Sequence, residues 1–212
     1  MKKVLVLGAG GQIARWVIDM LANNGKVEMN LFLRHPSKIK RNAPKNAHVV
    51  QGDVLNMEQL KHAIDGQDIV YANLTGDDID IQAANIVKAM NAAGVKRLIF
   101  VASLGIYDEV PGKFGEWNRR QIGAYLSPFR RAADVIEGSE LDYTVLRPAW
   151  LMDKDEVDYE TTERNQPFKG TEVSRKSVAA LIVKIIESPE LESRRNLGVN
   201  KPNSDGDKPA FM

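Results

Sequence analysis

Short apolar runs alternate with amphipathic segments along the first half of the chain. The runs are rich in Val, Ile, Leu and Phe, and the segments between them carry apolar residues at three- and four-residue steps. Five such runs are present, at 4–7, 27–33, 46–51, 69–74 and 96–102. Near-continuous apolar strands that alternate with helices are typical of a parallel sheet whose two faces are both covered. The pattern therefore predicts an α/β fold with a mainly parallel sheet and helices on both faces.

Beyond residue 103 the pattern is less regular. Residues 104–123 carry a proline and several glycines, and they predict an irregular connection. Ser127-Pro128 then either starts a helix, with Ser127 as N-cap, or kinks a helix that is already running. We expect a sixth strand at 142–147, a helix over 178–186 and a short last strand at 196–199. A connection this long inside a compact domain is more often functional than idle.

The length and charge of the chain bound the class of protein. A chain of 212 residues suits one domain. We expect this domain to span residues 1–200, with 150–200 as a small elaboration on the substrate side, and residues 201–212 to form a loosely held tail. Lys and Arg number 29 against 28 Asp and Glu, so no global field points to nucleic acid or to a membrane surface. A small-molecule substrate is therefore the expected partner. We also expect a cytoplasmic protein that is a monomer or homodimer.

Cysteine and histidine usage excludes several kinds of chemistry. The chain has no cysteine, which excludes a disulfide framework, a thiolate metal site and a thiol nucleophile. The three histidines, His35, His48 and His62, show no metal-ligand spacing. No metal centre is expected.

The first apolar run leads directly into a glycine cluster. A helix that begins on glycines after a buried strand leaves backbone N–H groups facing the strand end, where a phosphate can bind. Gly8, Gly11 and Ala14 fit a G-x-x-G-x-x-A pattern, whereas Ile13 stands where the commoner G-x-G-x-x-G pattern has its third glycine. The pattern indicates a dinucleotide site in a Rossmann-type, doubly wound sheet. Glycines that merely end a strand are the alternative.

Arg34 ends the second apolar run. In a dinucleotide fold this position, about 20 residues past the glycines, meets the adenosine ribose, where an arginine accommodates the 2′-phosphate of NADP. No acid stands between Arg34 and Asp53, whereas Arg34 and the residues after it supply five cations: Arg34, Lys38, Lys40, Arg41 and Lys45. We expect Arg34 to bind the 2′-phosphate, with Lys38 as a helper, and the last three cations to form a solvated loop.

Asp53 follows the third apolar run and has two interpretations. Asn56 is the expected N-cap of the next helix, so the Asp53 carboxylate is free for another role. It either accepts a hydrogen bond from the adenine amino group or forms a turn, and both interpretations stand.

Five segments carry a joint likeness to a known family. They are the glycine turn Gly8–Ala14, then Gly52–Val54, Val95–Ser103, Leu141–Pro148 and Val173–Ala179. Together they resemble the atypical branch of the short-chain dehydrogenase/reductase superfamily, the group of NmrA-like and NAD(P)H-binding proteins. The likeness spans nearly the whole chain.

The resemblance implies a set of contacts to NADP(H) that follow the strand ends. It implies that Gly8, Gly11, Gln12 and Ile13 surround the pyrophosphate, that Arg34 selects NADP, that Asp53 and Val54 border the adenine, that Leu74 and Thr75 line the nicotinamide ribose, and that the backbone near Pro148 meets the carboxamide. These residues are specific for fold and cofactor but not for the substrate.

The catalytic part of the resemblance is incomplete. Active members use a Tyr-x-x-x-Lys pair with a serine after the fifth strand, and Ser103 and Tyr125 match. The position four residues after Tyr125 is Phe129, and the nearest cations are Arg130 and Arg131. A lysine normally lowers the pKa of the tyrosine so that it can protonate a carbonyl oxygen, and an arginine does not place its charge at the same point.

These features favour an NADP-dependent oxidoreductase that transfers hydride to a small carbonyl, quinone or flavin-like acceptor. Hydride transfer to a flavin or quinone needs no strong protein acid, because the nicotinamide supplies the difficult chemistry. The rival is a non-enzymatic NADP(H)-binding sensor or regulatory protein of the NmrA-like type, which the missing lysine supports. An isomerase or epimerase that uses bound NAD ranks third, because Arg34 and the small C-terminal part count against it.

Overall fold

The computed structural model describes residues 1–39 and 42–212. The predicted solvated cations Lys40 and Arg41 therefore lie outside the described residues. None of the helices in these two ranges is long and apolar enough to cross a membrane.

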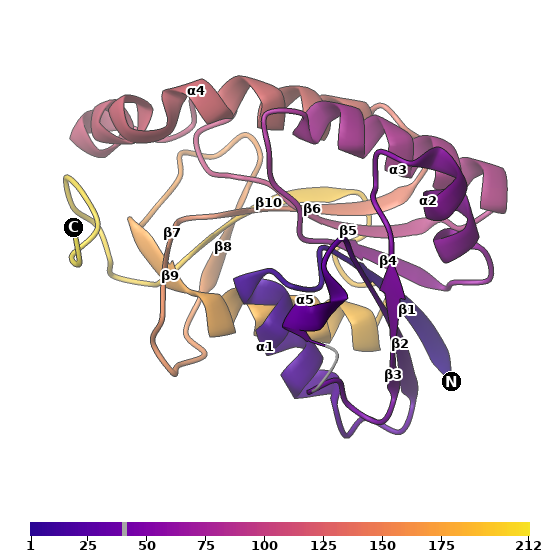
Figure 1. Cartoon of the computed structure of the whole chain (residues 1–212). Helices are drawn as coiled ribbons and strands as arrows, with labels where there is room; N and C mark the ends of the chain where they lie inside the picture. The colour runs from indigo at the N-terminus through magenta and orange to yellow at the C-terminus, as the bar shows by residue number, and fades with distance from the viewer. Residues whose placement is uncertain (40–41) are drawn as a thin grey trace.

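An eight-stranded sheet forms the centre of the molecule, in the order β3-β2-β1-β4-β5-β6-β10-β8 (Figure 1). All neighbours pair in parallel except β8, which runs antiparallel to β10. The strands are β1 (Lys2–Leu7), β2 (Val27–Leu33), β3 (Ala47–Gln51), β4 (Ile69–Ala72), β5 (Arg97–Val101), β6 (Asp142–Pro148), β8 (Glu160–Glu163) and β10 (Arg195–Asn200). Because β1 lies between β2 and β4, the chain reverses its direction of winding there, which is where doubly wound sheets bind ligands.

Helices cover both faces of the sheet, as Figure 1 shows. One face carries α1 (Gln12–Leu21) and α5 (Arg175–Glu187), and the other carries α2 (Met57–Ile64), α3 (Ile79–Ala93) and α4 (Gly112–Glu137); a short 3₁₀ helix spans Pro36–Lys38. The side chains of β1 alternate between the two cores: Val4 and Val6 pack under α1 and α5, and Leu5 and Leu7 pack under α2 and α3. The predicted doubly wound α/β fold is confirmed.

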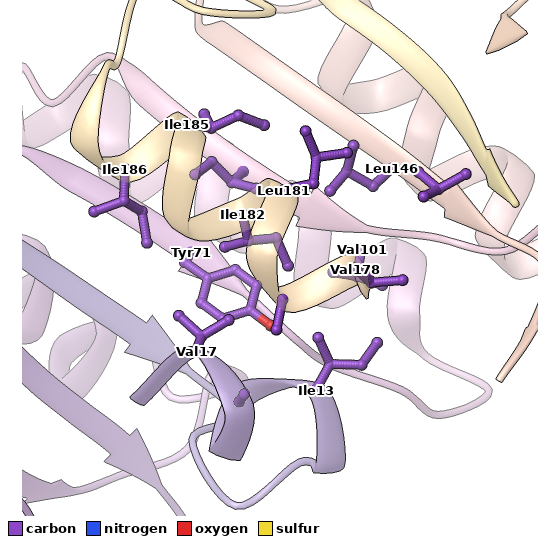
Figure 2. Packing of buried hydrophobic residues seen from close by; sticks show 14 of the residues in the cluster. Ile13, Val17, Tyr71, Val101, Leu146, Val178, Leu181, Ile182, Ile185 and Ile186 are labelled. Atoms are coloured by element: carbon purple, nitrogen blue, oxygen red, sulfur yellow. The ribbon is translucent and has the colours of Figure 1, made fainter. Parts of the chain in front are cut away.

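The core under α1 and α5 is centred on Tyr71. Its ring lies between the two helices, against Val17 of α1 and Ile182 of α5 (Figure 2). The ring is fully buried, and its hydroxyl makes no hydrogen bond to any described residue. Burial raises the pKa of Tyr71, so the hydroxyl stays neutral within the core.

Helix α4 corrects the prediction for the middle of the chain. The segment 104–123 is not irregular throughout, because α4 runs without a break from Gly112 to Glu137. Of the two interpretations of Ser127-Pro128, the helix that is already running holds, since Pro128 lies inside α4. Glycines and a proline lower helix propensity, but tertiary packing outweighs it here. A Cβ on Gly115 would lie 2.0 Å from the carbonyl oxygen of Val110, so only glycine fits there.

Three strands were not expected from the sequence: β8 of the main sheet, β7 (Trp150–Met152) and β9 (Glu172–Ser174). The strands β7 and β9 pair in parallel as a small second sheet. The C-terminal segment is hydrogen-bonded to the start of β9 and to the residue before it. The N–H of Thr171 donates to the carbonyl of Ser204 (2.9 Å), and the N–H of Ala210 donates to the carboxylate of Glu172 (2.7 Å). These contacts bring the end of the described chain to the carboxyl edge of the main sheet.

Candidate functional site

A cavity of about 440 Å³ lies at the carboxyl ends of β1, β2, β3 and β4. Its walls come from the turns that directly follow these strands. They include Gly8, Gly10, Gly11, Arg34, His35, Gly52, Asp53, Val54, Asn73, Leu74, Thr75, Gly76, Asp78 and Gln82. The structure thus brings together the predicted residues Gly8, Gly11, Arg34, Asp53, Val54, Leu74 and Thr75, whose roles stay predictions. We call this space the first cavity.

The glycine turn at the floor of the first cavity is held against Asn73. Gly8 has a φ of +76°, and a Cβ there would lie 2.2 Å from the backbone oxygen of Asn73. A Cβ on Gly11 would lie 1.9 Å from the side-chain nitrogen of the same residue. Gly8 therefore needs glycine, because the backbone directly after β4 approaches it closely and its φ is positive, whereas a Cβ at Gly11 requires the Asn73 side chain to move.

The start of α1 has the character of an anion site. Its N-cap is Gly11, which has no side chain to satisfy the first helical N–H groups, and the first turn contains no acidic residue. By contrast, the side chain of Asn56 caps α2 through the N–H of Gln59, and the side chain of Ser174 caps α5 through the N–H of Ser177. Uncapped N–H groups at a helix start bind phosphate well. The residues present therefore fit a pyrophosphate.

Arg34 and Asp53 stand at the end of the first cavity that β2 and β3 form. Arg34 is exposed, and no ion pair between described residues involves its guanidinium. The carboxylate of Asp53 accepts a hydrogen bond from the N–H of Leu55 (2.9 Å), which is the geometry of a turn-forming aspartate. Asp53 also lines the cavity, so its turn role and its predicted adenine role are compatible.

Gln82 supports the wall after β4 and was missed by the sequence analysis. It is 8% exposed, and its side-chain nitrogen donates to the carbonyl of Thr75 (3.2 Å) and to the carboxylate of Asp78 (2.7 Å). Asn73 was not singled out from the sequence either; its place at the polar end of the apolar run 69–74 was the signal available for it.

A second cavity, of about 410 Å³, lies at the carboxyl ends of β5 and β6. It is lined by Ala102, Ser103, Leu104, Ile122, Pro148, Ala149, Trp150, Leu151, Arg175, Phe211 and Met212. It holds the predicted residues Ser103 and Pro148 in mostly apolar surroundings. The hydroxyl of Ser103 donates to the carbonyl of Leu104 (3.1 Å), a weak local bond that a ligand can replace.

Three predicted site residues line neither cavity. Gln12 is exposed on α1, and Ile13 is 4% exposed because its side chain packs in the core (Figure 2). Any contact of Ile13 with a pyrophosphate would therefore use its main-chain N–H. Tyr125 lies within α4, is 51% exposed, and follows Ile122 of the second cavity by one helical turn.

The cations near Tyr125 are already engaged. Phe129 packs against the core under α3 and α4. The next two residues form ion pairs: Arg130 pairs with Asp134 (2.9 Å), and Arg131 pairs with Asp80 (2.6 Å). Both guanidinium groups that follow Phe129 are therefore already paired with carboxylates.

Tyr107 lies in a third cavity, of about 490 Å³, together with Arg130 and Arg164. Its hydroxyl donates to the carboxylate of Glu137 (3.2 Å) and accepts from the side-chain nitrogen of Asn196 (2.9 Å). Burial, with the nearby Glu137 charge, raises the pKa of Tyr107 to about 12. A phenol with this pKa is a poor proton donor near neutrality.

Comparison with known proteins supports a nucleotide site at the carboxyl edge of the main sheet. The NAD(P)H-binding family matches residues 8–189, which is most of the chain. The chain belongs to the NAD(P)H-binding family. A Rossmann-fold NAD(P)-binding family protein from Shigella flexneri is 57% identical, with a TM-score of 0.87 and 100% of each chain covered. The resemblance to the NAD(P)H-binding branch of the short-chain dehydrogenases/reductases is confirmed.

Two further relatives bear on cofactor and chemistry. A short-chain dehydrogenase/reductase from Veillonella parvula DSM 2008, in complex with NADP, is 29% identical, with a TM-score of 0.90 and 99% of each chain covered. Cinnamoyl-CoA reductase 1 from Petunia hybrida is 30% identical over 123 residues, 48% of this chain and 35% of that protein. This member of the NAD(P)H-binding family thus has a reductase-like fold and reductases among its relatives.

Proposed function

We propose that this protein is an NADPH-dependent reductase that transfers hydride to a small carbonyl, quinone or flavin-like acceptor. The observation that carries the proposal is the pairing of two cavities along one sheet edge. The first combines an uncapped helix start with the guanidinium of Arg34, which forms no ion pair with the described residues. The second is apolar and holds the hydroxyl of Ser103. We also propose a single domain over residues 1–200, a cytoplasmic location and a monomer or homodimer.

The cofactor roles follow the strand ends of the first cavity. NADPH, when bound, supplies the hydride. The N–H groups at the start of α1 hold the pyrophosphate, and Arg34 binds the 2′-phosphate in the bidentate manner of a planar guanidinium. The remaining contacts are those predicted: Asp53 and Val54 at the adenine, Leu74 and Thr75 at the nicotinamide ribose, and the backbone at Pro148 at the carboxamide. Support for NADP over NAD comes from Arg34 and from the relative whose structure contains NADP.

The acceptor class follows from the protein groups around Ser103. Ser103 donates a hydrogen bond to the acceptor oxygen and so orients it. Tyr125 stays a candidate proton donor, but it is half exposed, and its neighbouring arginines pair with other carboxylates. A quinone or flavin-like acceptor suits such a site best, because its reduction does not need a strong protein acid.

A non-enzymatic NADP(H)-binding sensor is the second candidate. It is favoured by Phe129, which is packed in the core at the position where active relatives of the resembled family carry a lysine. A sensor requires the first cavity but not the second. The apolar second cavity with its polar Ser103 is the reason that we prefer the reductase.

The loss of NADPH absorbance in the presence of quinones, flavins and aldehydes tests the proposal. A reductase oxidises NADPH with at least one acceptor, and Ser103→Ala slows this by about 10-fold or more, the range for a hydrogen bond to a developing oxyanion. Thermal shifts with NADPH and NADH are measured in parallel. Tight NADPH binding without turnover across the panel would establish the sensor, and no binding of either nucleotide would refute both candidates.

A further inference from the structure

The second cavity is apolar on nearly all sides. Of the described residues that line it, Arg175 alone has a charged side chain. Trp150 and Phe211 supply aromatic surface, and Ser103 supplies the hydroxyl. An apolar site with one cation and one hydroxyl recognises a ligand that has an apolar body, an oxygen to be bonded and a separate anionic group.

The guanidinium of Arg175 is only partly satisfied within the protein. Its side chain is 16% exposed, and its Nη1 donates to the carboxylate of Asp153 (2.9 Å). Its Nε is buried and makes no hydrogen bond to any described residue. Buried guanidinium N–H groups normally have partners, so the Arg175 guanidinium is left short of partners among the described residues.

The pairing with Asp153 does not explain why Arg175 is buried. The Asp153 side chain is 74% exposed, and ion pairs with one such exposed partner contribute little to stability. Arg175 also opens α5, where a positive charge opposes the helix dipole. Ser174 already caps this helix. Neither helix capping nor a strong ion pair therefore accounts for the position of Arg175.

We infer that Arg175 selects acceptors that carry an acidic oxygen group, a carboxylate or a phosphate. The inference rests on the proposed reductase function and adds the substrate class to it. The anion replaces Asp153 at Nη1 and also accepts from Nη2, because these two end donors of the planar guanidinium point in parallel toward two oxygens. The apolar body of the acceptor lies against Trp150, and Ser103 holds its reducible oxygen.

Matched pairs of acceptors test this assignment. The first pair is 4-carboxybenzaldehyde and its methyl ester, which differ in charge, and the second is FMN and riboflavin, which differ by a phosphate. In the wild-type protein we expect the anionic member of at least one pair to have the higher kcat/KM. Arg175→Gln should lower kcat/KM for that member by about 10- to 100-fold, the range for a lost charge-assisted hydrogen bond, and change the neutral member by less than about 3-fold. A charge preference within the first pair indicates a carboxylate site, and one within the second pair indicates a phosphate site.

Three control variants keep the test sharp. Lys176 is the next residue of α5 and pairs with Asp155, but it does not line the cavity, so Lys176→Gln should not change the preference. Arg175→Lys keeps the charge without the planar fork and should be intermediate. Asp153→Asn removes the competing carboxylate and should raise the affinity for the anionic acceptor a few-fold, a change that a merely structural role for Arg175 would not produce.

Calorimetry on the NADP⁺-saturated protein separates this inference from the reductase proposal. Binding of 4-carboxybenzaldehyde or FMN that Arg175→Gln abolishes would support the anion site even if no acceptor were reduced. Turnover with equal preference in wild type and Arg175→Gln would overturn the anion site while the reductase stood. Equal binding of charged and neutral members, or binding of neither, would also overturn it.

Discussion

The first cavity takes most of its walls from the turns directly after β1, β2, β3 and β4. The second takes its walls from the turn after β5, α4, the β6–β7 segment, α5 and residues 211–212. In the first, backbone approaches backbone, as at Gly8 and Asn73. In the second, side chains from distant segments meet. The nucleotide side therefore depends on local turn geometry, while the acceptor side depends on long-range packing and charge.

A buried ion pair holds the acceptor side together. Arg147 is fully buried on β6, where it pairs with Glu109 and donates to the side chain of Asn196 (2.7 Å). The carboxylate of Glu109 also accepts from the N–H groups of Gly105 (3.0 Å) and Tyr107 (2.9 Å). The segment after Ser103 is thereby fixed to the sheet by charge-assisted bonds rather than by turn residues.

Removal of Arg147 should have the largest effect on stability. Arg147→Met leaves the Glu109 carboxylate buried without its cation and should lower the free energy of unfolding by about 3–5 kcal/mol. Urea unfolding measures it. The matched control is Arg195→Met, which removes a 43% exposed arginine that pairs with Glu163 and should cost less than about 1 kcal/mol.

The double variant sharpens this prediction. Glu109→Gln combined with Arg147→Met removes both charges and should recover part of the loss, because the cost lies in the unpaired buried charge. A double variant that is as unstable as the sum of the two single variants would show that the pair is not coupled.

Gly8→Ala probes the nucleotide side in the same way. The added Cβ must avoid the Asn73 oxygen at 2.2 Å, and the residue must keep a φ of +76°, so we expect a loss of about 2–4 kcal/mol in urea unfolding. Gly94→Ala is the matched control, because Gly94 has a φ of +71° but nothing within 4 Å of the added Cβ. Its loss should be about 1 kcal/mol. Equal losses would mean that the close approach of Asn73 does not matter.

The same contrast explains what could be predicted from the sequence. The strand Val27–Leu33 and the helix capped by Asn56 were predicted with their observed start or cap, because apolar periodicity and a capping residue are local signals. The first half of helix α4 was missed because Gly115 is a local signal for irregular structure and Pro128 left open whether a helix starts there, and packing overrides both. No local pattern marks such an override.

The residues of the candidate site also differ in how far local sequence signals predict them. The glycine turn and Arg34 were identified because strand ends of parallel sheets meet at one edge. Arg175 was read only as part of a family-like segment, and Phe211 as part of a tail, since nothing in the sequence places them beside Ser103. Sites built from distant segments need the structure.

Arg34→Ala should change cofactor preference more than stability. Loss of a hydrogen-bonded charge pair with the 2′-phosphate should weaken NADPH binding by about 1.5–3 kcal/mol and leave NADH binding nearly unchanged. Calorimetry with both nucleotides measures the difference. Lys45→Ala is the control, because Lys45 is exposed and does not line the first cavity. An equal loss for both nucleotides would refute the assignment of Arg34 to the 2′-phosphate.

The smallest expected effect is a pH dependence on the acceptor side. The pKa of Tyr107 is raised to about 12, so between its ordinary value of 10.0 and this value the folded protein keeps a proton that the unfolded chain has lost. The resulting stability is present below pH 10.0 and is lost as the pH rises toward 12. Because the ring is partly solvated, we expect about 1 kcal/mol.

Comparison of wild type with Tyr107→Phe isolates this contribution, since the lysines and other tyrosines titrate alike in both proteins. The difference between their free energies of unfolding should shrink as the pH rises from about 9 to about 11.5. The first value is about one unit below the ordinary pKa, and the second is about half a unit below the raised pKa. The described lining of the first cavity contains no tyrosine, so NADPH affinity should not follow this change. A difference that stays constant with pH would show that Tyr107 keeps an ordinary pKa, and the charged network around it would then stabilise the acceptor side through Arg147 and Glu109 alone.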